Sequence, residues 1–202
     1  RKGYASLHNR NHNTGAQLIE KAKQTWKQHY DNDYSYIVQY FSSQLLLLTV
    51  CPECDYYTTN HDPIQVISLG LPEEVSDLRG CLVSYTSPKS DMDNTWKCDQ
   101  CKATVCPQQR TMLWQTSDVL VILLKRYQGG EKNDRYISFP DILDLNDICL
   151  SQSKSHAYAL QGMCIHEGSL GGGHYYAICI NHVDRQWYEY NDTMVRPVSK
   201  TQ

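Results

Sequence analysis

Two pairs of cysteines, each with two residues between its members, most constrain how this chain can fold. They are Cys51 with Cys54 and Cys98 with Cys101, and 43 residues separate the pairs. The spacing lets both thiolates of a pair reach one ion, so the four sulfurs suit a tetrahedral zinc site. We therefore predict a structural Zn²⁺ bound by all four cysteines, with the two pairs carried on distant hairpins.

The chain has nine cysteines, and the other five occur singly, mostly among apolar neighbours. This pattern is typical of a reducing compartment rather than of a secreted disulfide framework, so we expect an intracellular protein, cytoplasmic or nuclear. A disulfide or metal-free pairs are the alternatives to zinc. The remaining cysteines are Cys81, Cys106, Cys149, Cys164 and Cys179.

Composition excludes several function classes. The 202 residues are 41% hydrophobic and 20% charged, an ordinary globular balance. A net charge of −3 and a pI near 6.2 argue against a nucleic-acid-binding protein. No apolar run approaches the roughly 18 residues that a membrane span needs. The chain lacks an initiator Met and a signal-peptide pattern, and we expect it to be a piece of a longer protein.

Residue periodicity predicts an α+β fold. A capping box at Thr14 begins an apolar stripe that ends near Tyr30, and Ser76 is expected to cap a second helix with Cys81 in the core. Residues 44–50 and 56–60 are expected to form a hairpin that carries the first cysteine pair. The most apolar run, residues 119–127, is expected at the centre of a sheet.

The last third of the chain contains a candidate catalytic pair. His174 follows three glycines and begins a predicted strand, and Asn191 and Asp192 end the next one. In an antiparallel hairpin this places Asn191 beside His174, where a side-chain oxygen can fix the tautomer of a general base. The glycines would let a substrate backbone approach closely. The alternative is a structural histidine beside a flexible loop.

Several segments occur in an order typical of one enzyme family. They are residues 119–127, 139–145, 158–168, 172–177 and 187–195. These segments resemble the central strand and the histidine box of the ubiquitin-specific proteases, which are deubiquitinating cysteine proteases. The resemblance covers most of residues 16–198, and the histidine box is its most specific part.

The resemblance implies a papain-like fold shaped like a hand. Residues 1–202 would be a partial ubiquitin-specific protease domain with an antiparallel palm sheet and an inserted zinc ribbon. Residues 14–43 would be a remnant of the thumb helices, residues 44–110 the zinc-ribbon fingers with a helix, and residues 111–202 the palm with the histidine box. The implied partners are ubiquitin and ubiquitinated proteins.

The resemblance also implies roles for individual residues. Such enzymes cut the isopeptide or peptide bond after the C-terminal Gly-Gly of ubiquitin. His174 would be the general base and Asn191 the third member of the triad, with Asp192 assisting. The residues expected to border the channel for the ubiquitin tail are Gly171, Gly172, Gly173 and Tyr175.

The nucleophile of the family lies in a Gly-Asn-Thr-Cys segment before the zinc ligands, and no cysteine precedes Cys51 here. Packing explains Cys149, Cys164 and Cys179 better than a catalytic role, since none lies at an obvious helix N-terminus. We therefore predict that this chain alone does not cleave ubiquitin conjugates. The alternatives are a catalytically inactive ubiquitin-binding scaffold of the same family and a zinc-ribbon module unrelated to ubiquitin.

Overall fold

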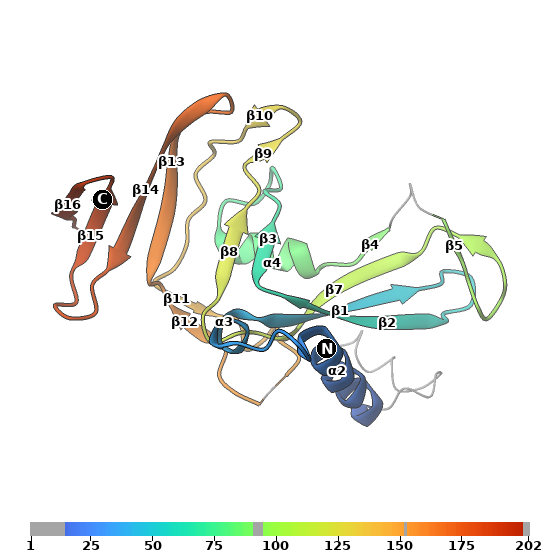
Figure 1. Cartoon of the computed structure of the whole chain (residues 1–202). Coiled ribbons are helices and arrows are strands. Elements are labelled where there is room, and N and C mark those ends of the chain that lie inside the picture. Colours follow the sequence, from blue (N-terminus) through green and yellow to red (C-terminus); the bar gives the residue numbers. More distant parts are fainter. Residues whose placement is uncertain (1–14, 91–94, 152, 200–202) are drawn as a thin grey trace.

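A computed structural model describes residues 15–90, 95–151 and 153–199. It confirms the predicted α+β class (Figure 1). No helix in these ranges is long and apolar enough to cross a membrane. The helices are α2 (Gly15–Tyr30), α3 (Tyr36–Phe41) and α4 (Leu78–Thr86). The strands are β1 (Ser43–Val50), β2 (Tyr57–Ile64), β3 (Val66–Leu69), β4 (Lys89–Ser90), β5 (Trp96–Lys97), β6 (Thr104–Val105), β7 (Gln108–Gln115), β8 (Val121–Leu124), β9 (Tyr127–Gln128), β10 (Glu131–Lys132), β11 (Ile142–Asp144), β12 (Ala157–Ala159), β13 (Gly162–Ser169), β14 (Gly172–Ile180), β15 (Trp187–Asn191) and β16 (Met194–Pro197).

One four-stranded sheet leads from the centre of the molecule to the cysteine pairs. Its strand order is β2-β1-β7-β4, and β1 pairs antiparallel with both β2 and β7 over most of its length. The predicted hairpin of residues 44–60 is the β1–β2 pair, which is longer than expected. The far end of this sheet lies beside β5, on the opposite side of the molecule from β15 and β16 (Figure 1).

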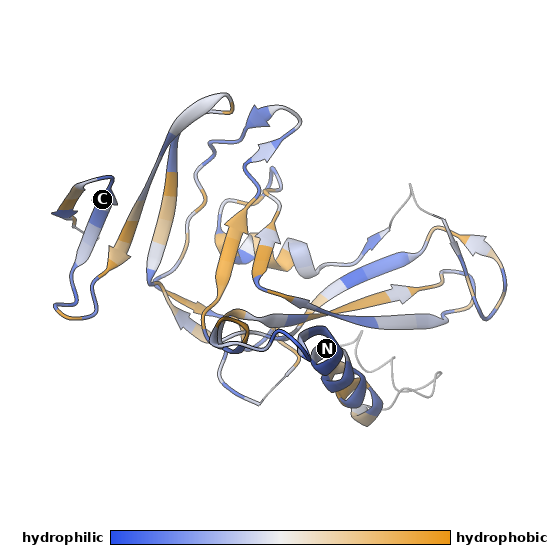
Figure 2. Cartoon of the chain, in the orientation of Figure 1, coloured by the Kyte–Doolittle hydropathy of each residue, from blue (hydrophilic) through white to orange (hydrophobic). Residues whose placement is uncertain are grey.

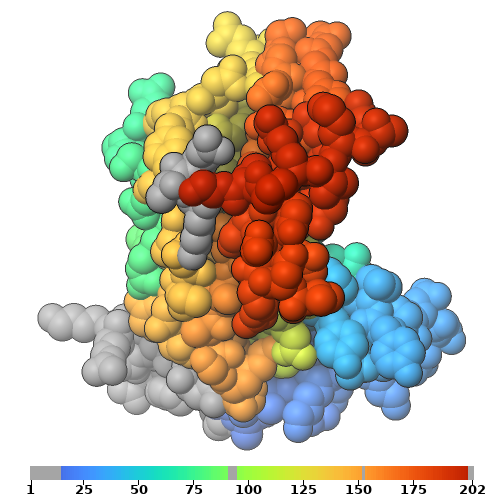
Figure 3. Space-filling model, turned by 90° about the vertical axis from the view of Figure 1, so that its left-hand side faces the viewer, coloured from blue at the N-terminus to red at the C-terminus, as the bar shows by residue number. Residues whose placement is uncertain are grey.

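A second four-stranded antiparallel sheet, in the order β13-β14-β15-β16, forms that opposite side (Figure 3). The glycine-rich segment over residues 168–173 forms only a short turn. Gly168 pairs with Gly173 and Ser169 with Gly172, so the strands continue up to the tip of the hairpin. Gly168 has a φ of +118°, and a Cβ there would lie 2.6 Å from the Gly172 carbonyl oxygen. Only glycine accepts this backbone conformation and spacing without strain.

The main hydrophobic core lies where α4 meets the inner ends of the strands. Cys81 is buried in it, as its helical phase predicts, together with Leu45 of β1 and Leu113 of β7. The N-cap of α4 is Asp77 rather than the predicted Ser76. The Asp77 Oδ1 accepts a hydrogen bond of 2.8 Å from the Gly80 N–H, so the carboxylate performs the capping that a serine hydroxyl was expected to perform. The predicted cap at Thr14 lies outside the described residues.

The prediction that residues 119–127 form the centre of a sheet is wrong. The strand β8 is shorter, and among the described strands it pairs only with β3, in parallel. Both strands are strongly apolar (Figure 2). However, Ile122 and Leu124 pack against the core, whereas Leu123 is 53% exposed. An apolar run indicates burial of both faces, but within the described residues only one face of β8 is covered.

The helix α2 packs on β2 and encloses an unusual histidine. His61 of β2 is 3% exposed, and neither ring nitrogen has a hydrogen-bond partner among the described residues. Its ring meets Trp114 edge-on at 4.8 Å between centroids. Burial, with a smaller contribution from Lys21 of α2, lowers the pKa of His61 to about 4. The imidazole is therefore neutral in the fold and must take up a proton when the chain unfolds in mild acid.

This histidine should make stability fall in mild acid. The free histidine has a pKa of about 6.5, so its contribution is complete above that pH and is lost as the pH falls towards 4, by about 3 kcal/mol in total. His61→Phe keeps an aromatic ring against Trp114 and cannot titrate. Denaturant unfolding at pH 7 and pH 4.5 should show a clearly smaller acid loss in His61→Phe than in the parent. The exposed His182→Phe is the matched control, and equal acid losses in all three proteins would refute the effect.

Candidate functional site

The two cysteine pairs have the same backbone geometry. In each pair the N–H of the residue after the second cysteine bonds to the carbonyl of the first, at 3.1 Å for Asp55 to Cys51 and 3.0 Å for Lys102 to Cys98. Asp55 and Lys102 both have left-handed backbones, with φ of 58° and 61°. The repeated turn aims both thiols of each pair at one point.

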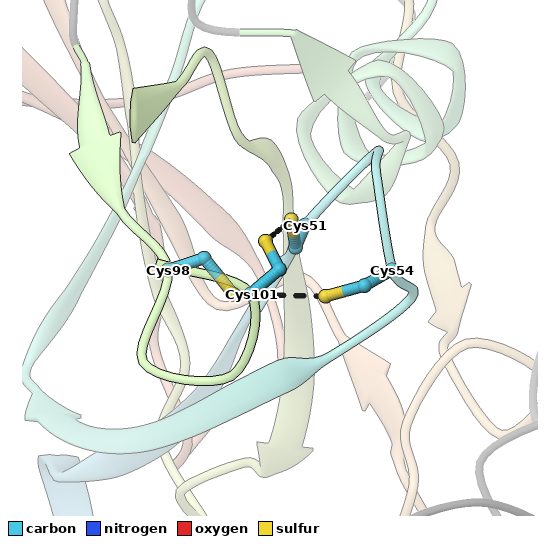
Figure 4. A group of neighbouring side chains, drawn as sticks. All are labelled: Cys51, Cys54, Cys98 and Cys101. Atoms are coloured by element: carbon cyan, nitrogen blue, oxygen red, sulfur yellow. Dashed lines mark hydrogen bonds between the residues drawn. The ribbon is translucent and has the colours of Figure 1, made fainter. Parts of the chain in front are cut away.

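The four sulfurs form one cluster (Figure 4). Cys51 Sγ lies 3.8 Å from Cys101 Sγ, Cys54 Sγ lies 3.7 Å from Cys98 Sγ, and all four atoms lie within 4.8 Å of one another. A tetrahedral ion with metal–sulfur bonds of about 2.3 Å separates its sulfurs by about 3.8 Å. The predicted ligands therefore come together in a geometry that fits a four-coordinate metal.

The four thiols lie close enough to perturb one another's protonation. The Tyr56 N–H acts to lower the pKa of Cys54, but burial and the three neighbouring thiols raise it to about 12. Burial also acts to raise the pKa of Cys98, but hydrogen bonds from the Cys101 and Gln100 backbone and from the Cys101 and Cys54 thiols lower it to about 7. Several thiolates this close together repel one another. A bound cation would offset their negative charge and so favour the deprotonated form of all four cysteines.

Metal removal should destabilise the chain. A metal present at about 100 times its Kd contributes about 2.7 kcal/mol, which corresponds to about 5–10 °C in Tm for a chain of this size. We expect one metal ion per chain by native mass spectrometry, none in Cys98→Ser, and a Tm loss of that size in this variant or with a chelator. The exposed Cys164→Ser should keep both metal and Tm. A metal-free parent with an unchanged Tm in chelator would contradict the site.

His174 and Asn191 lie together as predicted, near the tip of the β13–β14 hairpin and at the end of β15. His174 Nε2 is 2.6 Å from Asn191 Oδ1, whereas Asp192 Oδ2 is 3.9 Å away. With Oδ1 as the acceptor, Nε2 is the donor, and the neutral ring keeps Nδ1 free to accept a proton. Asp192 has a φ of 51° and begins the two-residue turn into β16, so its backbone also has a structural role.

No described cysteine shares the sheet face of His174. Side chains alternate between faces along a strand. Cys179 is five residues from His174 on β14, and Cys164 pairs with Ala177, three residues from His174. Both odd separations place these thiols on the opposite face. Cys149 is buried away from this sheet, and burial raises the pKa of its thiol.

The glycine-rich hairpin borders an open pocket of about 370 Å³. It contains every residue predicted to border a substrate channel, together with two aromatic partners that the sequence analysis did not assign. The Tyr127 hydroxyl lies 2.6 Å from His166 Nδ1, and the His166 ring lies 4.5 Å from that of Tyr175. Tyr175 follows His174 directly, so the two side chains point to opposite faces of β14. The lining residues are Tyr127, His166, Ser169, Leu170, Gly171, Gly172, Gly173 and Tyr175.

Comparison with known proteins assigns the segments that carry the cysteine cluster and the glycine-rich hairpin to one family. The family model described as ubiquitin carboxyl-terminal hydrolase matches residues 6–202. The chain belongs to this family of deubiquitinases. The resemblance to ubiquitin-specific proteases is thereby confirmed.

Relatives and solved structures agree with this assignment. A probable ubiquitin carboxyl-terminal hydrolase of Acanthamoeba polyphaga mimivirus is 34% identical over 90% of this chain and 42% of its own length. Ubiquitin carboxyl-terminal hydrolase 2 of Gallus gallus is 32% identical over 90% and 54%. The chain thus spans about half the length of these relatives. A SAGA DUB module with Ubp8, bound to monoubiquitin, matches with a TM-score of 0.75 and 27% identity over 91% of this chain and 43% of that chain.

Gly173 of this deubiquitinase-family hairpin, like Gly168, has no room for a side chain. A Cβ on Gly173 would lie 2.3 Å from both the Glu167 carbonyl oxygen and His166 Nε2. A Cβ on Gly172 would have no atom within 4 Å. Close approach of the Gly173 backbone therefore holds the His166 ring in the pocket.

The two glycines provide a matched pair of variants. Gly173→Ala should displace the His166 ring and destabilise the hairpin by about 1–3 kcal/mol, the usual cost of overpacking. Gly172→Ala should be close to neutral. Thermal unfolding measures the loss of stability, and the NMR shifts of the His166 ring measure its displacement. Equal behaviour of the two variants would contradict the close packing.

Proposed function

We propose that this chain carries the base and the ubiquitin-binding surfaces of a cysteine-type deubiquitinase, and that the nucleophilic thiol lies outside these 202 residues. The observation that carries the proposal is the 2.6 Å pair of His174 and Asn191 in a chain of the ubiquitin carboxyl-terminal hydrolase family. A lone histidine would be a weak argument, but a histidine held in one tautomer is what a general base requires.

In the proposed reaction His174 acts first as a general base and then as a general acid. Nδ1 takes the proton of the thiol, and the thiolate attacks the carbonyl carbon of the last glycine of ubiquitin, which breaks the bond from that carbon to the amine nitrogen. The resulting imidazolium returns the proton to the leaving amine, and water later releases ubiquitin from the thioester. Asn191 keeps Nε2 as a donor throughout, and Asp192 contributes negative charge from 3.9 Å.

The four-cysteine cluster has a structural role in this proposal. Thiolate ligands in a closed tetrahedron are typical of structural Zn²⁺, which leaves no open position for a substrate. The zinc would join the β1–β2 and β5–β6 hairpins into fingers that hold the body of ubiquitin. We retain the division into a thumb remnant at residues 14–43, fingers at residues 44–110 and a palm at residues 111–202. Bound ubiquitin in the similar SAGA DUB modules supports this assignment.

The pocket at the hairpin tip would receive the upstream part of the ubiquitin tail, and the tail would then cross the tip of the hairpin so that its last glycine reaches the face of His174. The tail ends in two glycines and is extended, so it needs a surface that its backbone can approach closely. Gly171 and Gly172 would meet nothing if given a Cβ, which leaves such a surface open. Tyr175 is 60% exposed and offers a flat apolar ring beside it.

The alternative is a ubiquitin-binding scaffold of the same family that performs no chemistry. The placement of Cys164 and Cys179 on the far face of the sheet favours binding without cleavage for this chain alone. The presence of His174 with an orienting amide favours the enzyme, because binding alone does not require them.

Ubiquitin binding tests the recognition half of the proposal. Tyr175→Ala should weaken binding by about two- to tenfold, since loss of an aromatic contact costs about 0.5–1.5 kcal/mol. Tyr136→Ala, at an even more exposed tyrosine outside the pocket, is the matched control. Ubiquitin without its last two residues should bind the parent and Tyr175→Ala equally weakly. Calorimetric titration of the parent and the two variants with each form of ubiquitin measures these affinities, and no binding to the parent would refute the proposal.

Hydrolysis tests the other half. The purified chain should give no turnover of a fluorogenic ubiquitin amide, because no described thiol shares the sheet face of His174. Turnover that a thiol alkylator abolishes would show that a cysteine of this chain is the nucleophile. His174→Gln should then remove that activity.

A further inference from the structure

Four polar side chains form a continuous row on one face of the β14–β15–β16 sheet. The row runs from His174 through Asn191 and Glu189 to Arg196. Strand register places all four on the same face, because Ala177 pairs with Tyr190 and Glu189 pairs with Arg196. Glu189 is 8% exposed, so its carboxylate is the buried centre of the row.

An asparagine by itself does not fix the tautomer of a histidine. Its amide can present either the oxygen or the NH₂ group to the ring. If the NH₂ group faced His174, Nε2 would have to accept and Nδ1 would carry the proton. The ring would then have no basic nitrogen free, so the base needs an additional constraint on Asn191.

Glu189 supplies that constraint. Its Oε1 lies 3.4 Å from Asn191 Nδ2, and its Oε2 accepts a hydrogen bond of 2.8 Å from Arg196. The hydrogen bond from Arg196 lowers the pKa of Glu189, so the carboxylate is ionised near neutral pH and can only accept. The NH₂ group of Asn191 must therefore turn to Glu189, and Oδ1 must turn to His174.

We propose that Glu189 is a positioning residue for the general base: it orients the Asn191 amide and thereby holds His174 with its proton on Nε2. The inference rests on the proposed function for its catalytic meaning. Glu189 also supplies a negative charge behind the neutral Asn191. This charge strengthens the hydrogen bond that the imidazolium form of His174 donates to Asn191. Arg196 keeps this carboxylate ionised and in place.

The tautomer of His174 is directly measurable without ubiquitin. Two-bond ¹H–¹⁵N NMR spectra of the ¹⁵N-histidine-labelled chain at pH 8 distinguish the two neutral tautomers, and His174→Gln assigns the signal. The parent should show the proton on Nε2. Glu189→Met removes the acceptor at similar length, and the fraction of ring protonated on Nδ1 should rise about threefold or more because Asn191 can then present either group.

Two further variants separate positioning from charge and from folding. Glu167→Gln removes a carboxylate from the residue paired with His174 on β13, and it should leave the tautomer unchanged. If Glu189→Met unfolds, Glu189→Gln decides, with a smaller shift in the same direction because its amide can still accept. An unchanged tautomer in the folded Glu189 variants, or an equal shift in Glu167→Gln, would overturn the proposal.

A rescue experiment gives the sharpest test. In Asn191→Asp both side-chain oxygens accept, so the tautomer no longer depends on Glu189. Adding Glu189→Met to Asn191→Asp should therefore leave His174 protonated on Nε2, and a tautomer shift there would contradict the mechanism. If the parent does not bind ubiquitin, the proposed function is refuted. If the tautomer of His174 is the same with and without Glu189, this inference alone is refuted.

Discussion

The antiparallel ladder of β1 is the constraint on which the rest of the structure depends. This strand is hydrogen-bonded on both edges, to β2 and β7. Its inner end contributes Leu45 to the main core, and Cys51 directly after its outer end is a member of the sulfur cluster. Its register therefore sets the position of the metal ligands relative to the core. A one-residue slip would turn its buried side chains to the other face.

The features predicted best from the sequence are those set by short-range spacing. The two thiols within each cysteine pair point to one place because a two-residue turn leaves them little freedom. The approach of Asn191 to His174 followed from hairpin geometry, since 17 residues with a turn between them bring these positions side by side. Both are local rules of chain geometry, and the roles of these residues remain proposals.

The features that were predicted wrongly or missed are those that depend on which segment of the chain packs against which. The run around Ile122 and Leu123 is apolar enough for a central strand, but hydropathy does not say what packs on each face. The cap of α4 was displaced by one residue because Ser76 and Asp77 are both good caps, and only the backbone decides between them. Tyr127 and His166 were not assigned to the pocket, since 39 residues separate them and only the fold brings them together. The buried state of His61 has no sequence signal either.

The alternation of side chains along β14 has a consequence for inhibition. His174 and Tyr175 are neighbours in sequence, yet their side chains lie on opposite faces of β14. The group that transfers the proton is therefore separated from the ring proposed to contact the tail. A small molecule in the pocket of Tyr175 and His166 would compete with a peptide tail without contacting Asn191 or the proton on His174. Its affinity would then be insensitive to the protonation of the base, and substitutions that disable the base would leave its binding site intact.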